Sequence, residues 1–284
     1  MNLMELESVF FSPPATLLWS AHTDRGRVRK NNEDSFVGLQ FNAQEVHHLG
    51  KIGEGSLDQG DFAFAVSDGM GGAHAGEFAS RIAVEKITRL LPRSFRLEAR
   101  GMNTGFGDVL AELFEQIHSA LVFLGGSDED CAGMGATLSL TWFQPGWMFF
   151  GHVGDSRIYF LPKSTGTIQQ ISHDDTYVGW LYRNGKISAH EARNHPRRNV
   201  LQKALGADHR YIDPQIGAVG CESGDIFLLC SDGLNEGLHE DRLLQLLRAP
   251  TTAEAELTPA LRLVRLSLEQ SGQDNTTALV VQVA

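Results

Sequence analysis

Two apolar segments of this chain end in the same tripeptide, Ser-Asp-Gly. The segments are Phe62–Val66 and Ile226–Cys230, and the acids that follow them are Asp68 and Asp232. Short apolar runs of this kind predict strands buried on both faces, so each carboxylate would be held rigidly at a strand end. The glycine after each acid, such as Gly69, would let the backbone turn sharply and bring its carbonyl oxygen near whatever the acid binds.

Two more acidic clusters adjoin strand-like segments. Glu33 and Asp34 come directly before Ser35–Leu39, and Asp274 comes shortly before Thr276–Val283. Four carboxylate stations that are far apart in sequence, each beside a strand end, predict one shared cation site. Because all these donors are oxygen atoms, they suit Mg²⁺ or Mn²⁺ better than Zn²⁺, which favours His and Cys.

Two cations in this site would resolve the repulsion among its acids, because carboxylates that share a pocket raise one another's pKa. Two divalent ions roughly 3.5–4 Å apart can activate a bridging water and stabilise a phosphoryl transition state. For any single Asp the alternative is a turn cap, since Asp-Gly is a common turn signal. That alternative does not explain why all the stations occur together.

A basic segment stands just before the acidic pair. It contains Arg25, Arg27, Arg29 and Lys30. An arginine beside a dimetal centre could bind phosphate oxygens through two parallel hydrogen bonds. The alternative is a solvated basic turn, which we expect for most but not all of the four residues.

Other catalytic motifs are absent from the sequence or broken. His190 and His195 flank a segment like the zinc-protease HExxH motif, but it has one residue too many. Side chains five residues apart lie about 140° apart around a helix, so these two cannot share a ligand face. The turn Gly69–Gly72 lacks the Gly-Lys-Ser/Thr ending of a phosphate-binding P-loop. No Gly-x-Ser-x-Gly elbow or reactive cysteine setting supports a covalent nucleophile.

Composition limits the partners and the location that we expect. The 284 residues carry a formal net charge of −11, which argues against nucleic acid or an anionic membrane as the main partner. The three cysteines are scattered, as in a reduced intracellular protein. Glu5 and Glu7 stand where a signal peptide needs basic residues, and no apolar stretch approaches the length of a membrane span. We therefore expect a cytoplasmic protein without a membrane partner.

Periodicity predicts the elements that must position the acids. Strands are expected at Thr16–His22, Ser35–Leu39, Phe62–Val66, Ala136–Phe143, Trp147–Val153, Arg157–Leu161, Thr167–Ile171, Tyr211–Val219, Ile226–Cys230 and Thr276–Val283. Helices are expected at Ala75–Leu91, Phe106–Leu124, Asp174–Asn184, Ser188–Asn194, Glu240–Arg248 and Ala253–Gln270. Pro92 should close the first helix, Gly125-Gly126 should stop the second, and Phe41–Asp61 should be a loop.

Antiparallel hairpins dominate this order, and the long helices come in pairs. Strands that are apolar on both faces need cover on both sides. The expected fold class is therefore mixed α/β (α+β): an α-β-β-α sandwich of two packed antiparallel sheets flanked by helix pairs. We expect one domain over residues 1–284, with a short N-terminal extension at 1–15.

In their order, these segments resemble the metal-dependent Ser/Thr protein phosphatases of type 2C, in their bacterial form. The resemblance extends from about Trp19 to Val283 and rests on six motifs, which together are far more specific than any one alone. They are Thr23-Asp24-x-Gly26-x-x-Arg29-x-x-Asn32-Glu33-Asp34, Val66-Ser67-Asp68-Gly69-Met70-Gly71-Gly72, Gly133-Met134-Gly135-Ala136-Thr137-Leu138, Gly151-His152-Val153-Gly154-Asp155-Ser156-Arg157, Cys230-Ser231-Asp232-Gly233-Leu234 and Gln273-Asp274-Asn275-Thr276-Thr277.

The resemblance implies a dimetal hydrolase that holds two Mn²⁺ or Mg²⁺ ions. By similarity, Asp68 bridges both metals, Asp232 and Asp274 complete one of them, and the Gly69 carbonyl serves the other. Glu33 and Asp34 would act directly or through water. Arg29 would hold the substrate phosphate while metal-bound hydroxide attacks phosphorus in line, with no phosphoenzyme.

A third, weaker metal is common among bacterial relatives, and Asp130 together with Asp232 is the candidate for it here. Residues 173–206 resemble the flap of the family beside the active site, where we expect substrate choice to be set. Asp155 is expected to have a structural role.

The sequence departs from the family pattern at two places. Met70 stands where many eukaryotic members carry a His thought to protonate the leaving group, and Met cannot do this. Asn235-Glu236 replaces the Thr-Asp or similar pair that commonly follows Asp-Gly-Leu, and we assign no metal role to Glu236.

The resemblance implies that the chain removes phosphate from phosphoserine and phosphothreonine in proteins. Its partners would be phosphorylated protein substrates and a cognate Ser/Thr kinase. Two alternatives remain open. A catalytically silent scaffold would lack one or more of the metal acids, and none is missing from the sequence. A phosphatase of the same fold could instead act on a small phosphorylated molecule, which a phosphopeptide assay would distinguish.

Overall fold

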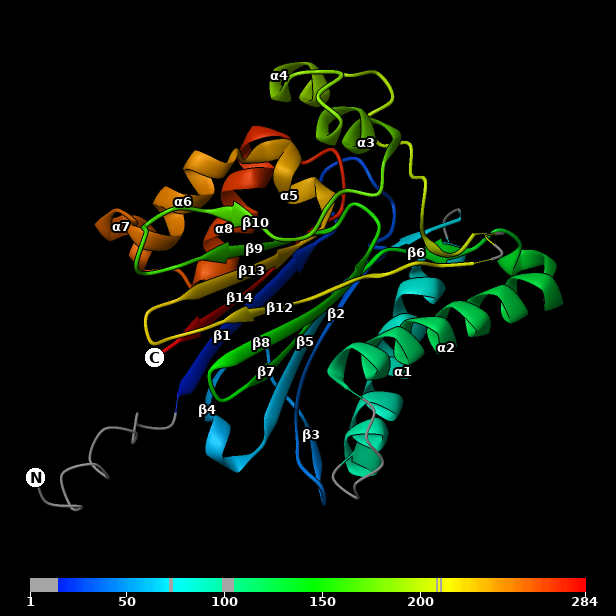
Figure 1. Ribbon diagram of the computed structural model, residues 1–284. Helices are drawn as coiled ribbons and strands as arrows, with labels where there is room; N and C mark the ends of the chain where they lie inside the picture. The colour runs from blue at the N-terminus through cyan, green and yellow to red at the C-terminus, as the bar shows by residue number, and fades with distance from the viewer. Residues whose placement is uncertain (1–14, 72–73, 99–104, 208, 210) are drawn as a thin grey trace, which may run out of the picture.

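Two antiparallel sheets packed face to face form the centre of the protein, and helices cover their outer faces (Figure 1). This computed structural model describes residues 15–71, 74–98, 105–207, 209 and 211–284. Most of the expected N-terminal extension, and Gly72 of the second motif, lie outside the described residues. The predicted α-β-β-α sandwich is confirmed.

The first sheet has the strand that comes last in sequence near its middle. Its order is β10 (Gln169–Gln170), β9 (Arg157–Leu161), β13 (Ile226–Cys230), β14 (Thr276–Val283), β1 (Thr16–Asp24) and β4 (Ile52–Ser56). Strand β14 pairs antiparallel with both β13 and β1.

The second sheet is built around the strand that ends with the first Ser-Asp-Gly motif. Its order is β11 (Leu205–Gly206), β6 (Gly135–Ala136), β5 (Asp61–Met70), β7 (Leu138–Gln144), β8 (Trp147–Val153) and β12 (Gln215–Gly220). Strand β2 (Asp34–Phe41) pairs with β5 and with the short β3 (Val46–His48).

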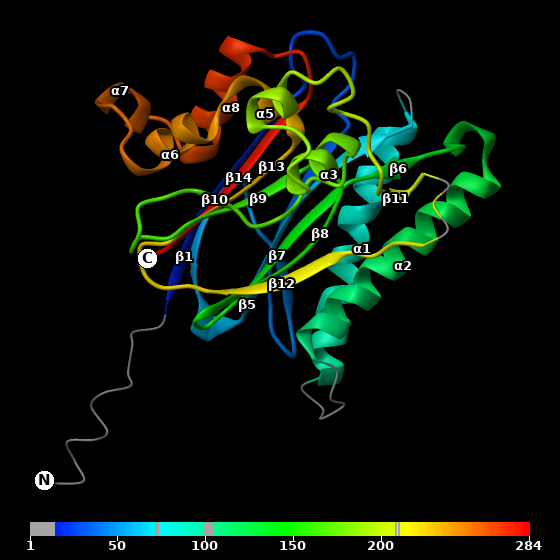
Figure 2. The same cartoon turned by 45° about the horizontal axis from the view of Figure 1, so that its top comes forward.

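Each sheet has its own helices. Helices α1 (Ala75–Glu98) and α2 (Phe106–Ser127) lie over the second sheet, and α5 (Asp232–Gly237), α6 (Glu240–Arg248), α7 (Thr252–Ala255) and α8 (Pro259–Gln270) lie on the side of the first (Figure 1). Helices α3 (Tyr177–Arg183) and α4 (Ala189–Arg193) stand at the end of the sandwich where α5 begins, as both views show (Figure 2).

Strand β5 shows how the sequence produces these layers. Its residues alternate between large and small, with Phe62 and Phe64 in the core between the sheets and Ala63 and Ala65 in the core under α1. Both faces are buried, as predicted. The small side chains let α1 pack closely, because its own buried face also begins with alanines, such as Ala79.

Some predicted boundaries are wrong for local reasons. Helix α1 continues past Pro92 to Glu98, with Pro92 inside it. Phe78 is 44% exposed, because Ala75, Ala79 and Ala83 form the buried face of this helix. Helix α2 runs through Gly125-Gly126 to Ser127.

Two segments contain more structure than expected. The stretch from Phe41 to Asp61 forms β3, β4 and a 3₁₀ turn (Leu57–Gln59) rather than a loop. The expected long last helix is broken into α7 and α8, because Pro259 starts α8 and cannot continue a preceding helix. The strand expected from Tyr211 begins only at Gln215.

Helix α2 is long and apolar enough, by length and composition alone, to cross a membrane. The expectation that no segment reaches this length is therefore wrong for α2. In the fold this helix is amphipathic: the side chains of Leu110, Phe114 and Ile117 are buried in the core against the second sheet, while Glu112 and Glu115 are exposed.

Candidate metal centre

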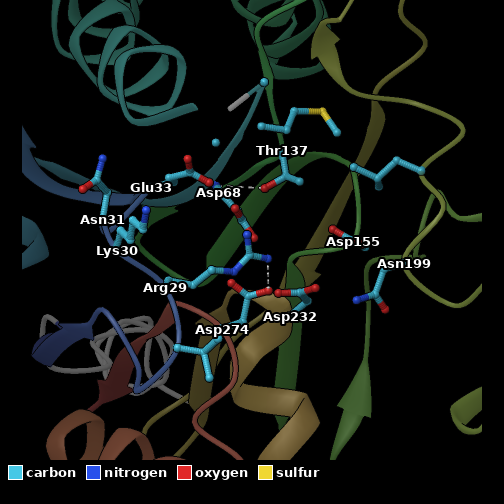
Figure 3. A pocket seen from close by; sticks show the side chains of 15 residues that line it. Arg29, Lys30, Asn31, Glu33, Asp68, Thr137, Asp155, Asn199, Asp232 and Asp274 are labelled. Atoms are coloured by element: carbon cyan, nitrogen blue, oxygen red, sulfur yellow. Dashed lines mark hydrogen bonds and ion pairs between the residues drawn. The ribbon is translucent and has the colours of Figure 1, made fainter. Parts of the chain in front are cut away.

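A cleft of about 510 Å³ opens at the end of the sandwich where the acid-bearing strand ends of both sheets meet (Figure 3). Its lining comprises Val28, Arg29, Lys30, Asn31, Glu33, Asp68, Gly69, Met70, Gly71, Thr137, Asp155, Asn199, Leu201, Asp232 and Asp274. Six of the eight residues that the sequence proposed as site residues therefore line one cleft; Asp34 and Asp130 do not.

The acids reach the cleft from different layers. Asp68 lies in β5 of the second sheet. Asp232 is the first residue of α5, and only Ser231 separates it from β13 of the first sheet. Asp274 precedes β14, and Glu33 precedes β2. The centre is thus assembled across the interface of the two sheets.

Asp34 lies beneath the cleft, buried beside Asp68. The two residues are directly opposite each other in the pairing of β2 with β5. Oδ2 of Asp34 accepts hydrogen bonds from Ser231 Oγ at 2.7 Å and from Thr277 Oγ1 at 2.6 Å. Burial raises the pKa of Asp34 to about 6, although these two hydroxyls act in the opposite direction.

Asp130 lies apart from the other acids. It is exposed in a short 3₁₀ turn (Glu129–Cys131), and its backbone N–H donates to Asp128 Oδ1. Its role toward a third metal stays a prediction.

The raised pKa values of two acids in the centre show that its negative charges repel one another. Burial, followed by the charges of Asp34 and Asp232, raises the pKa of Asp68 well above its ordinary value. Burial, followed by the charges of Asp155 and Asp274, does the same for Asp232. Like charges in a buried site need a compensating cation or protons.

Two buried oxygen atoms show where that compensation is needed. Oδ1 of Asp34 and Oδ1 of Asp232 are both buried, with no hydrogen-bond partner among the described residues. An orphaned buried carboxylate oxygen costs free energy unless a cation or donor meets it. An all-oxygen donor set with orphaned atoms fits Mg²⁺ or Mn²⁺.

The acids do not already form a closed cage. Within the described ranges, no three His, Cys, Asp or Glu side chains are close enough to make a ready-made metal site. Instead the guanidinium of Arg29 lies among them, and its Nη2 donates to Asp274 Oδ2 at 2.6 Å (Figure 3). This hydrogen bond is the first cause that raises the pKa of Arg29, and Glu33 and Asp68 contribute.

The glycines of the two Ser-Asp-Gly motifs do not act as we predicted. Gly69 continues strand β5, and Gly233 lies inside helix α5, so neither makes a sharp turn. A Cβ at Gly69 would collide with the carbonyl oxygen of Gly76, and one at Gly233 would collide with that of Asn275. Both positions need glycine because another backbone passes directly against them.

Asn275 holds the loop that carries the basic segment. Its side chain is 3% exposed, and its Nδ2 donates to the carbonyl oxygens of Arg25 and Asn31, each at 2.9 Å. Its Oδ1 accepts from the backbone N–H of Glu33 at 2.8 Å. The sequence showed Asn275 only as part of a motif, and its partners are more than 240 residues away.

Thr137 supports the strand that carries the central acid. Its Oγ1 accepts from the backbone N–H of Asp68 at 3.0 Å and shares a 2.6 Å hydrogen bond with Ser156 Oγ. Asp155 lines the cleft too, and burial raises its pKa to about 7. Sequence reasoning assigned Asp155 only a structural role, although it stands in one of the quoted motifs.

The two departures from the family pattern also have clear positions. Met70 lines the cleft but has no proton to donate. Glu236 forms an ion pair with Arg198, with Nη2 and Oε1 3.1 Å apart, so that α5 is connected to the segment 173–206.

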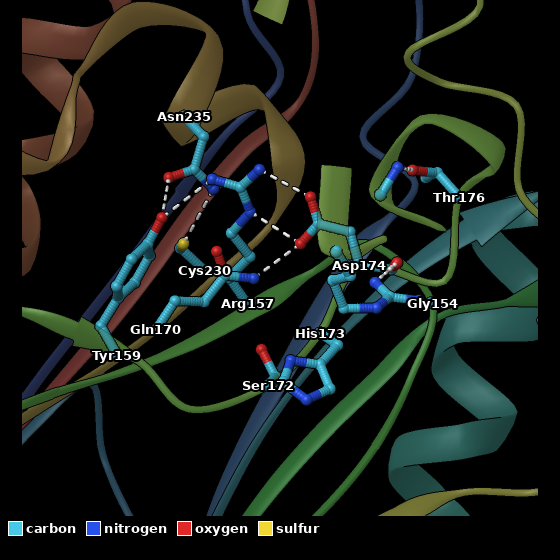
Figure 4. Close-up of polar contacts among 12 residues, drawn as sticks. Gly154, Arg157, Tyr159, Gln170, Ser172, His173, Asp174, Thr176, Cys230 and Asn235 are labelled. Carbon is cyan, nitrogen blue, oxygen red and sulfur yellow. Dashed lines mark hydrogen bonds and ion pairs between the residues drawn. The ribbon is translucent and has the colours of Figure 1, made fainter. Parts of the chain in front are cut away.

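A partly buried polar network anchors the base of that segment (Figure 4). Arg157 in β9 donates from Nε and Nη2 to the two carboxylate oxygens of Asp174, at 2.9 and 2.6 Å. Its Nη1 donates to the hydroxyl of Tyr159 at 2.9 Å, and that hydroxyl donates to Asn235 Oδ1 at 3.0 Å. Since Asn235 is in α5, the helix that begins with Asp232 is connected to the same network.

Comparisons with known proteins identify similar sequences. A family model described as "Protein phosphatase 2C" matches residues 51–264. The chain is 33% identical over 271 residues to the serine/threonine protein phosphatase PstP of Mycobacterium tuberculosis, across 94% of this chain but only 45% of that protein. It is 31% identical over 265 residues to the serine/threonine phosphatase stp of Listeria monocytogenes, across 92% of this chain and 93% of that protein.

Solved structures are similar as well. The catalytic domain of PstP in complex with two manganese ions is 30% identical to this chain, with a TM-score of 0.72. The match covers 95% of this chain and 99% of that one.

Proposed function

Because the chain belongs to the protein phosphatase 2C family, we propose that it hydrolyses phosphoserine and phosphothreonine in proteins and so reverses the action of Ser/Thr kinases. The resemblance found in the sequence is confirmed by the family match. The observation that carries the activity is the cleft itself, where acids from both sheets, two of them with orphaned buried oxygens, surround an arginine. This chain spans less than half of the length of its M. tuberculosis relative, so its substrates and partners are part of the proposal.

Two Mn²⁺ or Mg²⁺ ions would be held by Asp68, Asp232 and Asp274 with the carbonyl of Gly69, while Glu33 and Asp34 act directly or through water. The manganese ions of the similar catalytic domain support this assignment. When bound, the ions lower the pKa of water and offset the charge of a phosphoryl group.

The protein's own residues have separable tasks in this reaction. The Arg29 side chain is half exposed at the cleft, where its planar donor group can bind phosphate oxygens in a bidentate manner. Asp274 competes with phosphate for that guanidinium. Asn275 fixes the backbone on both sides of Arg29 and so sets where the guanidinium can reach.

The hydrolysis rate of a phosphothreonine peptide, with added Mn²⁺ or Mg²⁺ and then with EDTA, tests the proposal. Turnover that depends on the metal is the expected result. Absence of turnover by folded, metal-loaded protein would favour a silent scaffold if small phosphate esters also failed, or a small-molecule phosphatase if only they were hydrolysed. The presence of every metal acid in the sequence argues against the scaffold.

We also propose that residues 1–284 act as one catalytic domain, in the cytoplasm, beside a cognate kinase. Shared hydrophobic cores between the layers support the single domain. Three free cysteines support a reducing compartment.

A further inference from the structure

Two segments beside the cleft have the opposite charge to the rest of the protein. The chain has 24 Lys and Arg against 35 Asp and Glu. Residues 25–30 contain four basic and no acidic residues, and residues 177–203 contain six basic residues and one acid, Glu191. These two segments, which we name the basic collar, thus hold ten of the 24 cations and one of the 35 acids.

Both parts of the collar reach the cleft. Lys30 lines it from the first segment, and Asn199 and Leu201 line it from the second. Figure 3 shows Lys30 and Asn199 on opposite sides of the acidic centre. A peptide whose phosphorylated residue enters the cleft can therefore place its neighbouring residues over one or both segments.

Much of the collar's charge is not neutralised by the protein itself. Lys30, Lys186 and Arg193 are exposed, and none has an ion pair within the described part of the chain. Arg197 lies over the ring of Tyr177, 4.6 Å from its centroid, which leaves its charge available. The collar does not merely balance the acids of the centre, because it extends beyond Arg29, the member that contacts them.

We propose that the basic collar selects phosphorylated segments that carry Asp or Glu beside the phosphorylated residue. This inference rests on the proposed function and names the substrate class of that site. Each exposed ion pair gives a gain of up to about fivefold, so two or three together give a preference of about tenfold or more. Salt weakens exposed pairs, so the preference should shrink at high ionic strength.

The test compares two phosphothreonine peptides of equal length, one with Asp and Glu and one with Ala and Gln beside the phosphothreonine. We expect kcat/KM for the acidic peptide to be about tenfold higher at low salt and to approach that of the neutral peptide in 0.5 M NaCl. The double variant Lys186→Ala/Arg193→Ala should reduce the ratio of kcat/KM for the acidic peptide to kcat/KM for the neutral one. Arg89→Ala, an exposed arginine on α1 paired with Glu85, is the matched control and should keep it.

p-Nitrophenyl phosphate has no flanking residues. Its hydrolysis therefore tests the phosphatase activity separately from the selection of acidic peptides by the basic collar. Equal turnover of both peptides and of this ester would overturn the collar and leave the phosphatase intact. An equal loss on all three substrates in the double variant would also overturn it, because the loss would then lie in the centre.

Binding provides a second readout that needs no turnover. Fluorescence anisotropy of the labelled peptides in EDTA should show tighter binding of the acidic peptide to the wild-type chain. Equal binding of the two peptides would overturn the proposed role of the basic collar, whether or not phosphate esters are hydrolysed. Absence of hydrolysis would refute the phosphatase proposal separately.

Discussion

The guanidinium of Arg29 donates a 2.6 Å hydrogen bond to the carboxylate of Asp274, a residue 245 positions further along the chain. The residue expected to bind phosphate thus lies against a residue expected to bind metal. Charge compensation explains this contact, because the surrounding acids have raised pKa values and Arg29 is the cation that lies among them. Binding of metal ions by the acids of the centre should therefore release Arg29 from Asp274 and make it available to bind phosphate.

Replacement of Arg29 by Ala should mainly weaken substrate binding. Hydrogen bonds to charged groups contribute about 1.5–3 kcal/mol, so KM for p-nitrophenyl phosphate should rise about 10- to 100-fold. Arg29→Lys keeps the charge without the planar fork and should be intermediate. An unchanged KM in Arg29→Ala would remove Arg29 from phosphate binding.

Replacement of Asp68 or Asp232 by Asn should abolish hydrolysis at saturating Mn²⁺ while the fold persists, as measured by circular dichroism. In EDTA these variants should melt at a higher temperature than the wild type, because a neutral amide relieves the repulsion that raises the pKa of both acids. Each 1 kcal/mol relieved corresponds to about 2–4 °C. Substantial activity in either variant would contradict the site assignment.

Replacement of Asn275 by Ala should loosen the loop that carries Arg29. The change leaves the carbonyls of Arg25 and Asn31 and the N–H of Glu33 without their partner. We expect the free energy of unfolding in urea to fall by about 2–4 kcal/mol and KM to rise. Gln116→Ala, which removes an exposed amide on α2, is the control and should change neither.

His152 should make stability depend on pH. It is buried, its Nδ1 lies 2.9 Å from Ser139 Oγ, and burial lowers its pKa below 6.5. The unfolded chain then binds more protons than the folded one below pH 6.5, so His152 favours folding above this pH and the contribution is lost as pH falls.

The comparison that isolates this effect is wild type against His152→Gln in urea unfolding between pH 5 and pH 8. The difference in stability between them should change in favour of the variant as pH falls. A difference that stays constant over this range would show that His152 does not titrate on unfolding.

The sequence was sufficient to predict the layers and most of the acids, because both depend on local patterns. The alternation in β5 is visible in Phe62 to Val66, and the acids follow such runs directly. Helix ends were less predictable. Pro92 and the Gly125-Gly126 pair are tolerated inside helices.

Contacts between residues that are far apart in the sequence could not be predicted from it. Gly69 and Gly233 are turn signals by composition, but their small size is needed for contacts with backbone distant in sequence or in another element. The hydrogen bonds from Asn275 to the loop that carries Arg29 likewise depend on which segments the two sheets bring together. The position of Asp155 in the cleft depends on this too.

Strand β14 follows every other described element in the chain, yet it lies between β13 and β1 in its sheet, and Asp274 and Asn275 directly precede it. During synthesis, β1 and β13 cannot become part of one sheet through β14 until β14 has been translated. Until it leaves the ribosome, the centre lacks an acid and the basic loop lacks its anchor. If the chain has the proposed phosphatase activity, a nascent chain should therefore gain it only after β14 has been translated and has paired with β1 and β13.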